Sequence, residues 1–234
     1  MSLPVINVPT YELVVPSTKE KLVYRPFLVK EEKILLMAME EEKEAQLNRA
    51  LKQVVNNCTF EKIKVEKLPL FDLEYIFLRI RAKSVGEVAK LSLLCEDDGE
   101  TYVPVEINLE DIEVEFQEGH DPKIQLTDEI GIVMGYPTFE YLDLNVASAD
   151  VATLFNLIGN SIHQIFEGEK IYERADFNKK ELKTFLESLT SDQFKKVQNF
   201  FETMPRLRHT IEIENPKTKK QNTVLLEGLN AFFE

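Results

Sequence analysis

The N-terminal part of the chain alternates apolar and polar residues, which is the pattern of half-buried β-strands. Two alternating runs flank the segment Pro16–Glu20, where proline fixes φ and Ser and Thr can form local hydrogen bonds. The pattern therefore predicts a β-hairpin over residues 10–27, preceded by an extended arm over residues 1–9. The apolar positions of the two strands are Tyr11, Leu13, Val15, Leu22 and Tyr24.

A helical region is predicted between Lys30 and Asn57, because this segment lacks Gly and Pro and is rich in strong helix formers. The acidic cluster at residues 40–44 predicts a break or bend, and the part beyond it carries an amphipathic stripe. The part before the break has too many apolar residues for one narrow stripe. We therefore expect other elements to enclose it; its apolar residues are Ile34, Leu35, Met37 and Met39.

Shorter elements follow up to residue 136. Asp72 is expected to cap a short helix that ends at Ser84–Gly86. Alternation then predicts a series of strands, and an Asp98-Gly99 pair is a typical hairpin turn between the first two. The predicted strands cover residues 90–95, 101–108, 112–116 and one or two parts of 124–134.

The pattern changes near Pro137 from strand-rich to helix-rich. Residues 149–166 keep a 3.6-residue apolar period and predict one amphipathic helix, in which Gly159 allows another element to approach closely. The C-terminus returns to strand over residues 210–226 and ends in a helical turn. Between them, two capping boxes predict two short helices; they pair Asn178 with Glu181 and Thr190 with Gln193.

These patterns predict an α+β fold. Antiparallel β-hairpins and a small sheet are expected in the N-terminal half, and a helical cluster with a terminal β-hairpin in the C-terminal half. A soft boundary divides a β-rich region at 1–136, with an inserted helical segment at 30–84, from a mainly helical region at 137–234. A single domain is the alternative, since 234 residues suit one large domain or two modest ones.

The charge balance bears on the kind of partner. The formal net charge is −13, from 28 Lys and Arg against 41 Asp and Glu. This balance argues against nucleic-acid binding, which takes clustered basic residues. It suits docking on a basic partner, although plain solubility is the commoner explanation. We expect no secretory signal, no membrane span, and reduced thiols at Cys58 and Cys95.

No pattern of catalytic or cofactor-binding residues is recognisable. The eight glycines form no phosphate-binding loop, and the two cysteines and three histidines lack the spacing of a zinc site. His163 is expected to be a satisfied residue of the helix at 149–166. The acidic segment 97–100 is more typical of a solvated turn than of a calcium site. We therefore expect no catalytic residue, cofactor, metal or small-molecule substrate; a nucleophilic pair of Cys95 with a histidine stays an open alternative.

Two sets of residues are candidates for a partner interface. The first is the most basic patch in an acidic chain, which either docks a partner or forms the solvated face of a helix. The second is the apolar C-terminus, which either binds a partner or closes the protein's own core. The candidates are Arg79, Arg81 and Lys83 in the first set, and Leu229, Phe232 and Phe233 in the second.

Several segments resemble those of a known family. Together with the length, they make the chain similar over nearly its whole extent to the baseplate-hub proteins of contractile-tailed, T-even-type bacteriophages, which include hub subunits and hub assembly proteins. Each segment is short and carries no mechanism of its own. The segments are Tyr24–Lys33, Tyr136–Phe139, Phe200–His209 and Leu225–Phe233.

The resemblance implies a non-enzymatic virion or assembly protein that binds other baseplate hub proteins. It would lie in the host cytoplasm during assembly, and in the tail baseplate if it is retained there. Whether it stays in the baseplate or leaves as an assembly chaperone is open. The alternative is a small cytoplasmic enzyme or regulator with a dispersed site, which a deep pocket with convergent polar groups would reveal.

Overall fold

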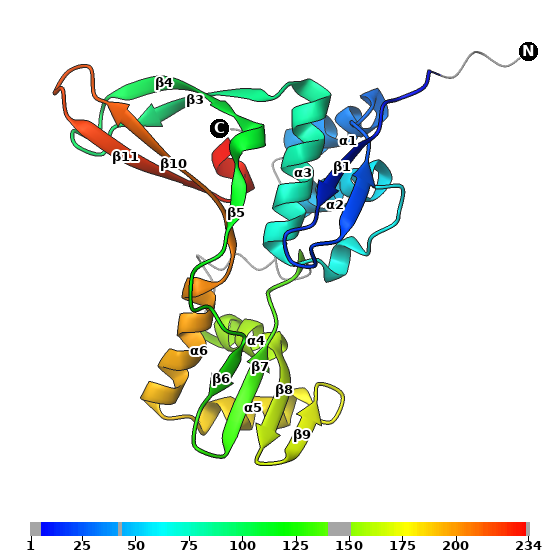
Figure 1. Cartoon of the computed structure of the whole chain (residues 1–234), viewed down its shortest axis with the longest axis vertical. Coiled ribbons are helices and arrows are strands. Elements are labelled where there is room, and N and C mark those ends of the chain that lie inside the picture. The colour runs from blue at the N-terminus through cyan, green and yellow to red at the C-terminus, as the bar shows by residue number, and fades with distance from the viewer. Residues whose placement is uncertain (1–5, 42–43, 140–150, 233–234) are drawn as a thin grey trace, which may run out of the picture. The chain divides into compact units, whose positions relative to one another are not determined.

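The computed structural model describes residues 6–41, 44–139 and 151–232 (Figure 1). The chain forms two compact units: unit 1 comprises Met1–Glu115 and Arg206–Glu234, and unit 2 comprises Phe116–Pro205. Unit 2 is therefore an insertion in the chain of unit 1. The boundary expected near Pro137 coincides with neither link, because the change in composition there marks a change of elements within unit 2.

Unit 1 begins with the β-hairpin that the alternation predicts. Strands β1 (Tyr11–Val14) and β2 (Lys21–Tyr24) pair antiparallel, with Tyr11 opposite Tyr24. The predicted break in the helical region is also confirmed, because α1 (Val29–Glu40) and α2 (Glu44–Cys58) are separate helices. A short 3-10 helix, η1 (Val65–Lys67), then leads to α3 (Leu70–Val85).

Helix α3 is buried around most of its circumference, as expected for a helix enclosed by other elements. Its fully buried apolar side chains are Leu73, Ile76, Leu78 and Ile80. The predicted capping role of Asp72 is wrong, since Pro69 holds the N-cap position and Asp72 lies in the first turn. The Asp72 carboxylate instead accepts hydrogen bonds from the backbone N–H and the hydroxyl of Ser17. These bonds join the β1–β2 turn to α3.

Two β-structures complete unit 1. Strands β3 (Val88–Leu94) and β4 (Tyr102–Asn108) form the predicted hairpin, and the short η2 (Leu109–Asp111) follows it. The next strand, β5 (Glu113–Glu115), does not continue that hairpin. It pairs with β10 (Arg206–Glu214), which also pairs with β11 (Gln221–Glu227), in the order β11-β10-β5. The chain ends in η5 (Leu229–Phe232).

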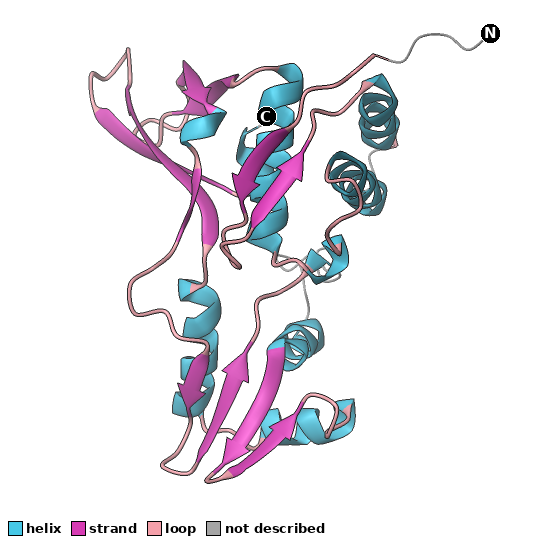
Figure 2. Cartoon of the chain, turned by 45° about the vertical axis from the view of Figure 1, so that its right-hand side comes forward, coloured by secondary structure: helices cyan, strands magenta, loops and turns pink. Residues whose placement is uncertain are grey.

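Unit 2 is built on a four-stranded antiparallel sheet in the order β6-β7-β8-β9 (Figure 2). The strands are β6 (Lys123–Gln125), β7 (Ile130–Met134), β8 (Ile162–Glu167) and β9 (Lys170–Glu173). The helices are α4 (Val151–Ser161), α5 (Lys179–Glu187) and α6 (Ser191–Thr203). The predicted capping boxes open α5 and α6, with the side chains of Asn178 and Thr190 bonded to the third residue of each helix.

The single helix predicted over residues 149–166 is wrong. Helix α4 ends at Ser161, and the chain continues as β8, which pairs with β7 and β9. His163 therefore lies in a strand. Two glycines opposite β8 favour the strand: a Cβ at Gly131 would lie 2.1 Å from Phe166 Cζ, and a Cβ at Gly135 would lie 2.1 Å from His163 Cε1. The prediction failed because a short apolar run fits both periods.

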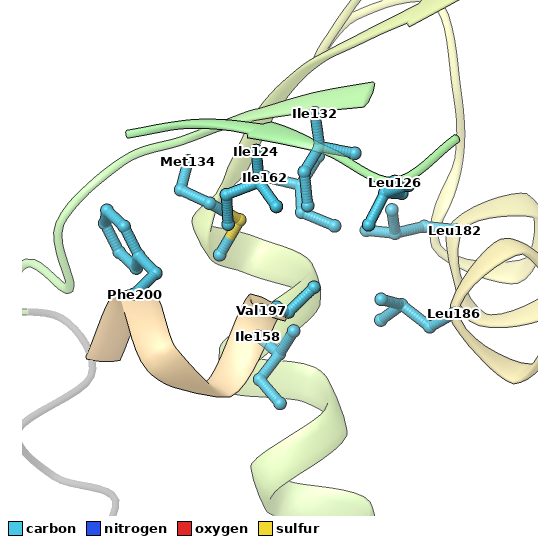
Figure 3. Close-up of a cluster of buried hydrophobic side chains, with 10 residues drawn as sticks. All are labelled: Ile124, Leu126, Ile132, Met134, Ile158, Ile162, Leu182, Leu186, Val197 and Phe200. Carbon is cyan, nitrogen blue, oxygen red and sulfur yellow. The ribbon is translucent and has the colours of Figure 1, made fainter. Parts of the chain in front are cut away.

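The core of unit 2 lies between its sheet and its helices (Figure 3). Gly159 of α4 has the predicted role, since a Cβ there would come within 3.0 Å of Leu182 Cδ2 on α5. The core side chains are Ile124, Leu126, Ile132, Met134, Ile158, Ile162, Leu182, Leu186, Val197 and Phe200.

The mixture of helices and small antiparallel sheets in both units confirms the predicted α+β class. Within the described residues, no helix combines the length and the apolar character that crossing a bilayer requires.

Candidate interface surfaces

The C-terminal candidates for partner binding lie in or next to η5 of unit 1. Phe232 is fully buried, and Leu229 is half-buried. The backbone N–H of Leu229 donates to the Glu74 carboxylate of α3 at 3.2 Å. Phe233 lies outside the described residues. These contacts favour the alternative in which this end of the chain closes the core of unit 1, and a role in partner binding stays a prediction.

The basic candidates lie at the C-terminal end of α3. Arg79 is buried and donates to the backbone oxygens of Leu109 and Ile112 at 2.9 and 2.8 Å, and it pairs with Glu113 at 2.8 Å. These bonds fix the connection from β4 to β5 on α3. A docking role for Arg79 would need it to exchange these internal partners, so that role also stays a prediction.

Arg81 and Lys83 are likewise engaged within unit 1. Arg81 donates to the backbone oxygen of Gly86 at 3.1 Å. Lys83 forms ion pairs with Glu87 and Glu110. Hydrogen bonds from Lys83 to these two carboxylates raise the pKa of its amine. Lys83 thus neutralises acidic neighbours of its own unit, and a docking role for Arg81 and Lys83 stays a prediction.

Helix α1 exposes large apolar side chains among charged ones, which include Lys33 and Glu40. The helix was expected to be enclosed, but the structure buries only Glu31 and Ala38 of its residues. We call the outward side chains Val29, Leu36, Met37 and Met39 the α1 face; their exposed fractions are 79%, 55%, 55% and 62%. The expectation was wrong because α1 packs through the opposite side of the helix, and no described element covers the α1 face.

A buried ionic cluster holds α1 in this orientation. Glu31 is fully buried and accepts hydrogen bonds from Arg25 at 3.0 Å and from the Leu28 backbone N–H at 2.9 Å. Asn57 of α2 donates to the same carboxylate at 3.3 Å. Burial opposes ionisation of Glu31, but the bonds from Arg25 and Leu28 outweigh it and lower its pKa. This polar anchor on the inward side of α1 leaves Leu36, Met37 and Met39 facing outward.

The acidic segment at 97–100 is part of a hydrogen-bonded junction. Asn215, at the start of the β10–β11 turn, donates to Asp97 at 2.8 Å and to Asp98 at 3.0 Å. Thr218 also donates to Asp97, and Thr101 donates to Asp98 at 2.6 Å. The two carboxylates thus bind the turns of two hairpins together. Among the described residues, no group of three His, Cys, Asp or Glu side chains is arranged to hold a metal ion.

Neither cysteine has the environment of a nucleophile. Cys58 and Cys95 are free and buried. Burial raises the pKa of the Cys58 thiol to about 12. Burial, together with the charges of Asp97 and Asp98, also raises the pKa of Cys95. A reactive thiol needs the opposite shift, because the thiolate is the nucleophile.

The histidine with the most defined environment is His120 of unit 2. Its Nδ1 lies 2.9 Å from the hydroxyl of Thr203, and its ring stacks on Tyr136 with centroids 5.7 Å apart. Phe200 packs against the same ring at 5.0 Å. Burial lowers the pKa of His120. These contacts are those of a neutral packing residue at the edge of the unit 2 core.

The chain is thus a two-unit α+β protein with exposed apolar side chains on α1. A family model described as T4 bacteriophage base plate protein matches residues 8–234, which is nearly the whole chain. The chain therefore belongs to this family and is a phage baseplate protein. No curated protein and no solved structure matches the chain.

Proposed function

We propose that the chain is a non-enzymatic component or assembly factor of the baseplate hub, and that it works by binding other hub proteins. The α1 face is the observation that carries this proposal. Large apolar side chains that remain exposed together on one helix typically mark a surface that a partner covers. Two of the four are methionines, whose flexible side chains adapt to a partner and are enriched at interfaces.

The fixed orientation of α1 supports the same function. An interface needs its contact side chains to be presented on a rigid element, since ordering them during binding costs conformational entropy. The bonds of Glu31 to Arg25 and Asn57 hold α1 before a partner arrives. The face is therefore preorganised for association.

The enzyme alternative finds no support in the geometry of the described residues. The groups whose acidity is most shifted by burial include Cys58 and Glu74 of unit 1. The pockets described on unit 2 are lined by other residues: two by a mixture of apolar and polar side chains, and a third mainly by polar ones. Cys58 and Glu74 therefore line none of these pockets, whereas a catalytic centre would bring such groups into one.

The experiment that tests this function is co-purification from infected cells with a variant of the α1 face. Leu36→Lys and Met39→Lys together should abolish association with baseplate intermediates, because they place two charges in the apolar contact. Their effect on the melting temperature should be small, since both side chains are exposed. Leu225→Lys is the matched control, because Leu225 is equally exposed on β11, at 52%.

Undiminished association of the α1 double variant would contradict the proposal. Sedimentation of the wild-type chain distinguishes a hub subunit from an assembly chaperone. A hub subunit should be found in finished particles, whereas an assembly chaperone should be found only with intermediates.

A further inference from the structure

Helices α4 and α5 of unit 2 border a surface pocket of about 430 Å³. Its apolar lining comes from Phe155 and Gly159 on α4 and from Leu182 and Leu186 on α5. Figure 3 shows Leu182 and Leu186 projecting from α5 toward the core of the unit. Because Gly159 has no side chain, the two helices approach closely at the base of this pocket.

A second pocket of about 430 Å³ adjoins the first and extends it toward α6. Phe155, Leu186 and Glu187 line both pockets, and the second adds Leu189 and Phe194. The rings of Phe155 and Phe194 stack with their centroids 5.3 Å apart. We call the two pockets together the α4–α6 groove. Each pocket has room for a side chain, so the groove can take more than one side chain of a peptide segment.

Lysines outnumber carboxylates in the lining of this groove, and one of them, Lys195, lies 3.5 Å from Asp192 of its own helix. Lys179 and Lys183 line its α5 end, and Lys195 lines its α6 end. Five of the eight Lys and Arg residues between Phe116 and Pro205 lie in Lys179–Lys196, although the chain as a whole has a net charge of −13. Glu187 is the carboxylate that lines both pockets, and it lies 3.7 Å from Lys183.

An apolar floor with lysines at both ends fits one chemical class of occupant. We infer that the α4–α6 groove binds an acidic amphipathic segment of another baseplate protein. Aromatic or aliphatic side chains of that segment enter between Phe155 and Leu186, and its carboxylates pair with Lys179, Lys183 and Lys195. Complementary charge sets the register, while burial of apolar side chains supplies most of the affinity. The inference rests on the proposed function, because it takes the chain to work by binding other baseplate proteins. It assigns one of them to a surface other than the α1 face.

The test uses the full chain and a library of random dodecapeptides displayed on phage. Selection on the wild-type chain should enrich peptides that combine Asp or Glu with Phe, Leu or Ile. A selected peptide should bind the Lys179→Glu and Lys183→Glu double variant at least about tenfold more weakly, because like charges then face each other. The same peptide should also bind more weakly as the salt concentration rises.

Two control variants separate the groove from the overall charge. Lys170→Glu with Lys217→Glu makes the same change in net charge at exposed positions outside the groove lining, and should leave binding unchanged. Asn156→Trp places a large side chain at the rim of the pocket and should weaken binding without a change of charge, because Asn156 is exposed there.

The inference is overturned if the selected peptides carry no excess of acidic residues. It is also overturned if the two lysine double variants weaken binding equally, or if selection yields no peptide that competes for the groove. These results leave the proposed function intact as long as the α1 variants still lose association with baseplate intermediates. Loss of acidic-peptide binding together with intact α1-dependent association would therefore identify a failure of the groove alone.

Discussion

The side-chain amide of Asn215 lies 2.8 Å from the carboxylate of Asp97, and so joins the β10–β11 turn to the β3–β4 turn across 118 positions of sequence. Asn215 is fully buried, and the backbone N–H groups of Lys217 and Thr218 donate to its side-chain oxygen. Asn215 is therefore the buried centre of the junction between the two hairpin turns, to which Thr218 and Asn222 add bonds with Asp97.

Asn215→Ala should lower the free energy of unfolding by about 1–3 kcal/mol, because it removes an amide that pairs with two carboxylates and leaves buried polar groups without partners. Chemical denaturation of the full chain measures this value. Lys217→Ala is the control in the same turn, since Lys217 is exposed and should change stability little. Equal stability of Asn215→Ala and wild type would show that the junction contributes nothing.

Glu74 makes a second long-range contact, from α3 to the C-terminal turn. Burial raises the pKa of Glu74 to about 7, and the nearby charge of Glu227 adds to the rise, whereas the Leu229 N–H bond and the charge of Arg206 oppose it. In the unfolded chain this pKa returns to 4.5. The folded state therefore binds the proton more tightly, and the stability contributed by Glu74 is lost as the pH rises from about 4.5 to about 7.

Glu74→Gln should remove this loss of stability at high pH, while keeping a side-chain oxygen that can accept a hydrogen bond from the Leu229 N–H. At about pH 8 the variant should have a higher melting temperature than wild type. The difference in melting temperature should shrink as the pH falls toward about 5. Glu212→Gln on β10 is the matched control, because Glu212 is exposed. A difference between Glu74→Gln and wild type that is the same at both pH values would contradict this assignment.

The C-terminal turn should be part of the core. Phe232→Ala should lower the free energy of unfolding by about 3–5 kcal/mol, since Phe232 is fully buried. Deletion of residues 229–234 should also lower the melting temperature. If the truncated chain instead keeps its melting temperature and loses partner binding, the C-terminus is an interface, as one of the two sequence-based alternatives holds.

The sequence predicted the elements whose signals are local. The β1–β2 and β3–β4 hairpins each have their turn residues between two alternating runs, and the capping boxes at Asn178 and Thr190 span only four residues each. Such patterns fix a structure without information from distant parts of the chain. The α+β class follows from them.

The errors arose where distant residues decide the structure. The apolar positions Ile162, Ile165 and Phe166 fit a helix by their spacing, but pairing with β7 makes this segment a strand. The pairing of β5 with β10, which makes unit 2 an insertion, joins residues on either side of the whole of that unit. The exposed α1 face was missed because its apolar residues resemble those of a buried helix. The buried Glu31 and Ala38 show which side of α1 faces inward.

The central claim is that the α1 face binds another baseplate protein. The most direct measurement places a photo-crosslinking amino acid at Leu36 during infection and identifies the crosslinked protein by mass spectrometry. The same amino acid at Leu225 serves as the control for an exposed apolar position elsewhere in unit 1. The account predicts a crosslink from position 36 to one defined baseplate protein, with none from position 225. Crosslinking from position 225 alone, or no crosslink from position 36 in assembled intermediates, would contradict it.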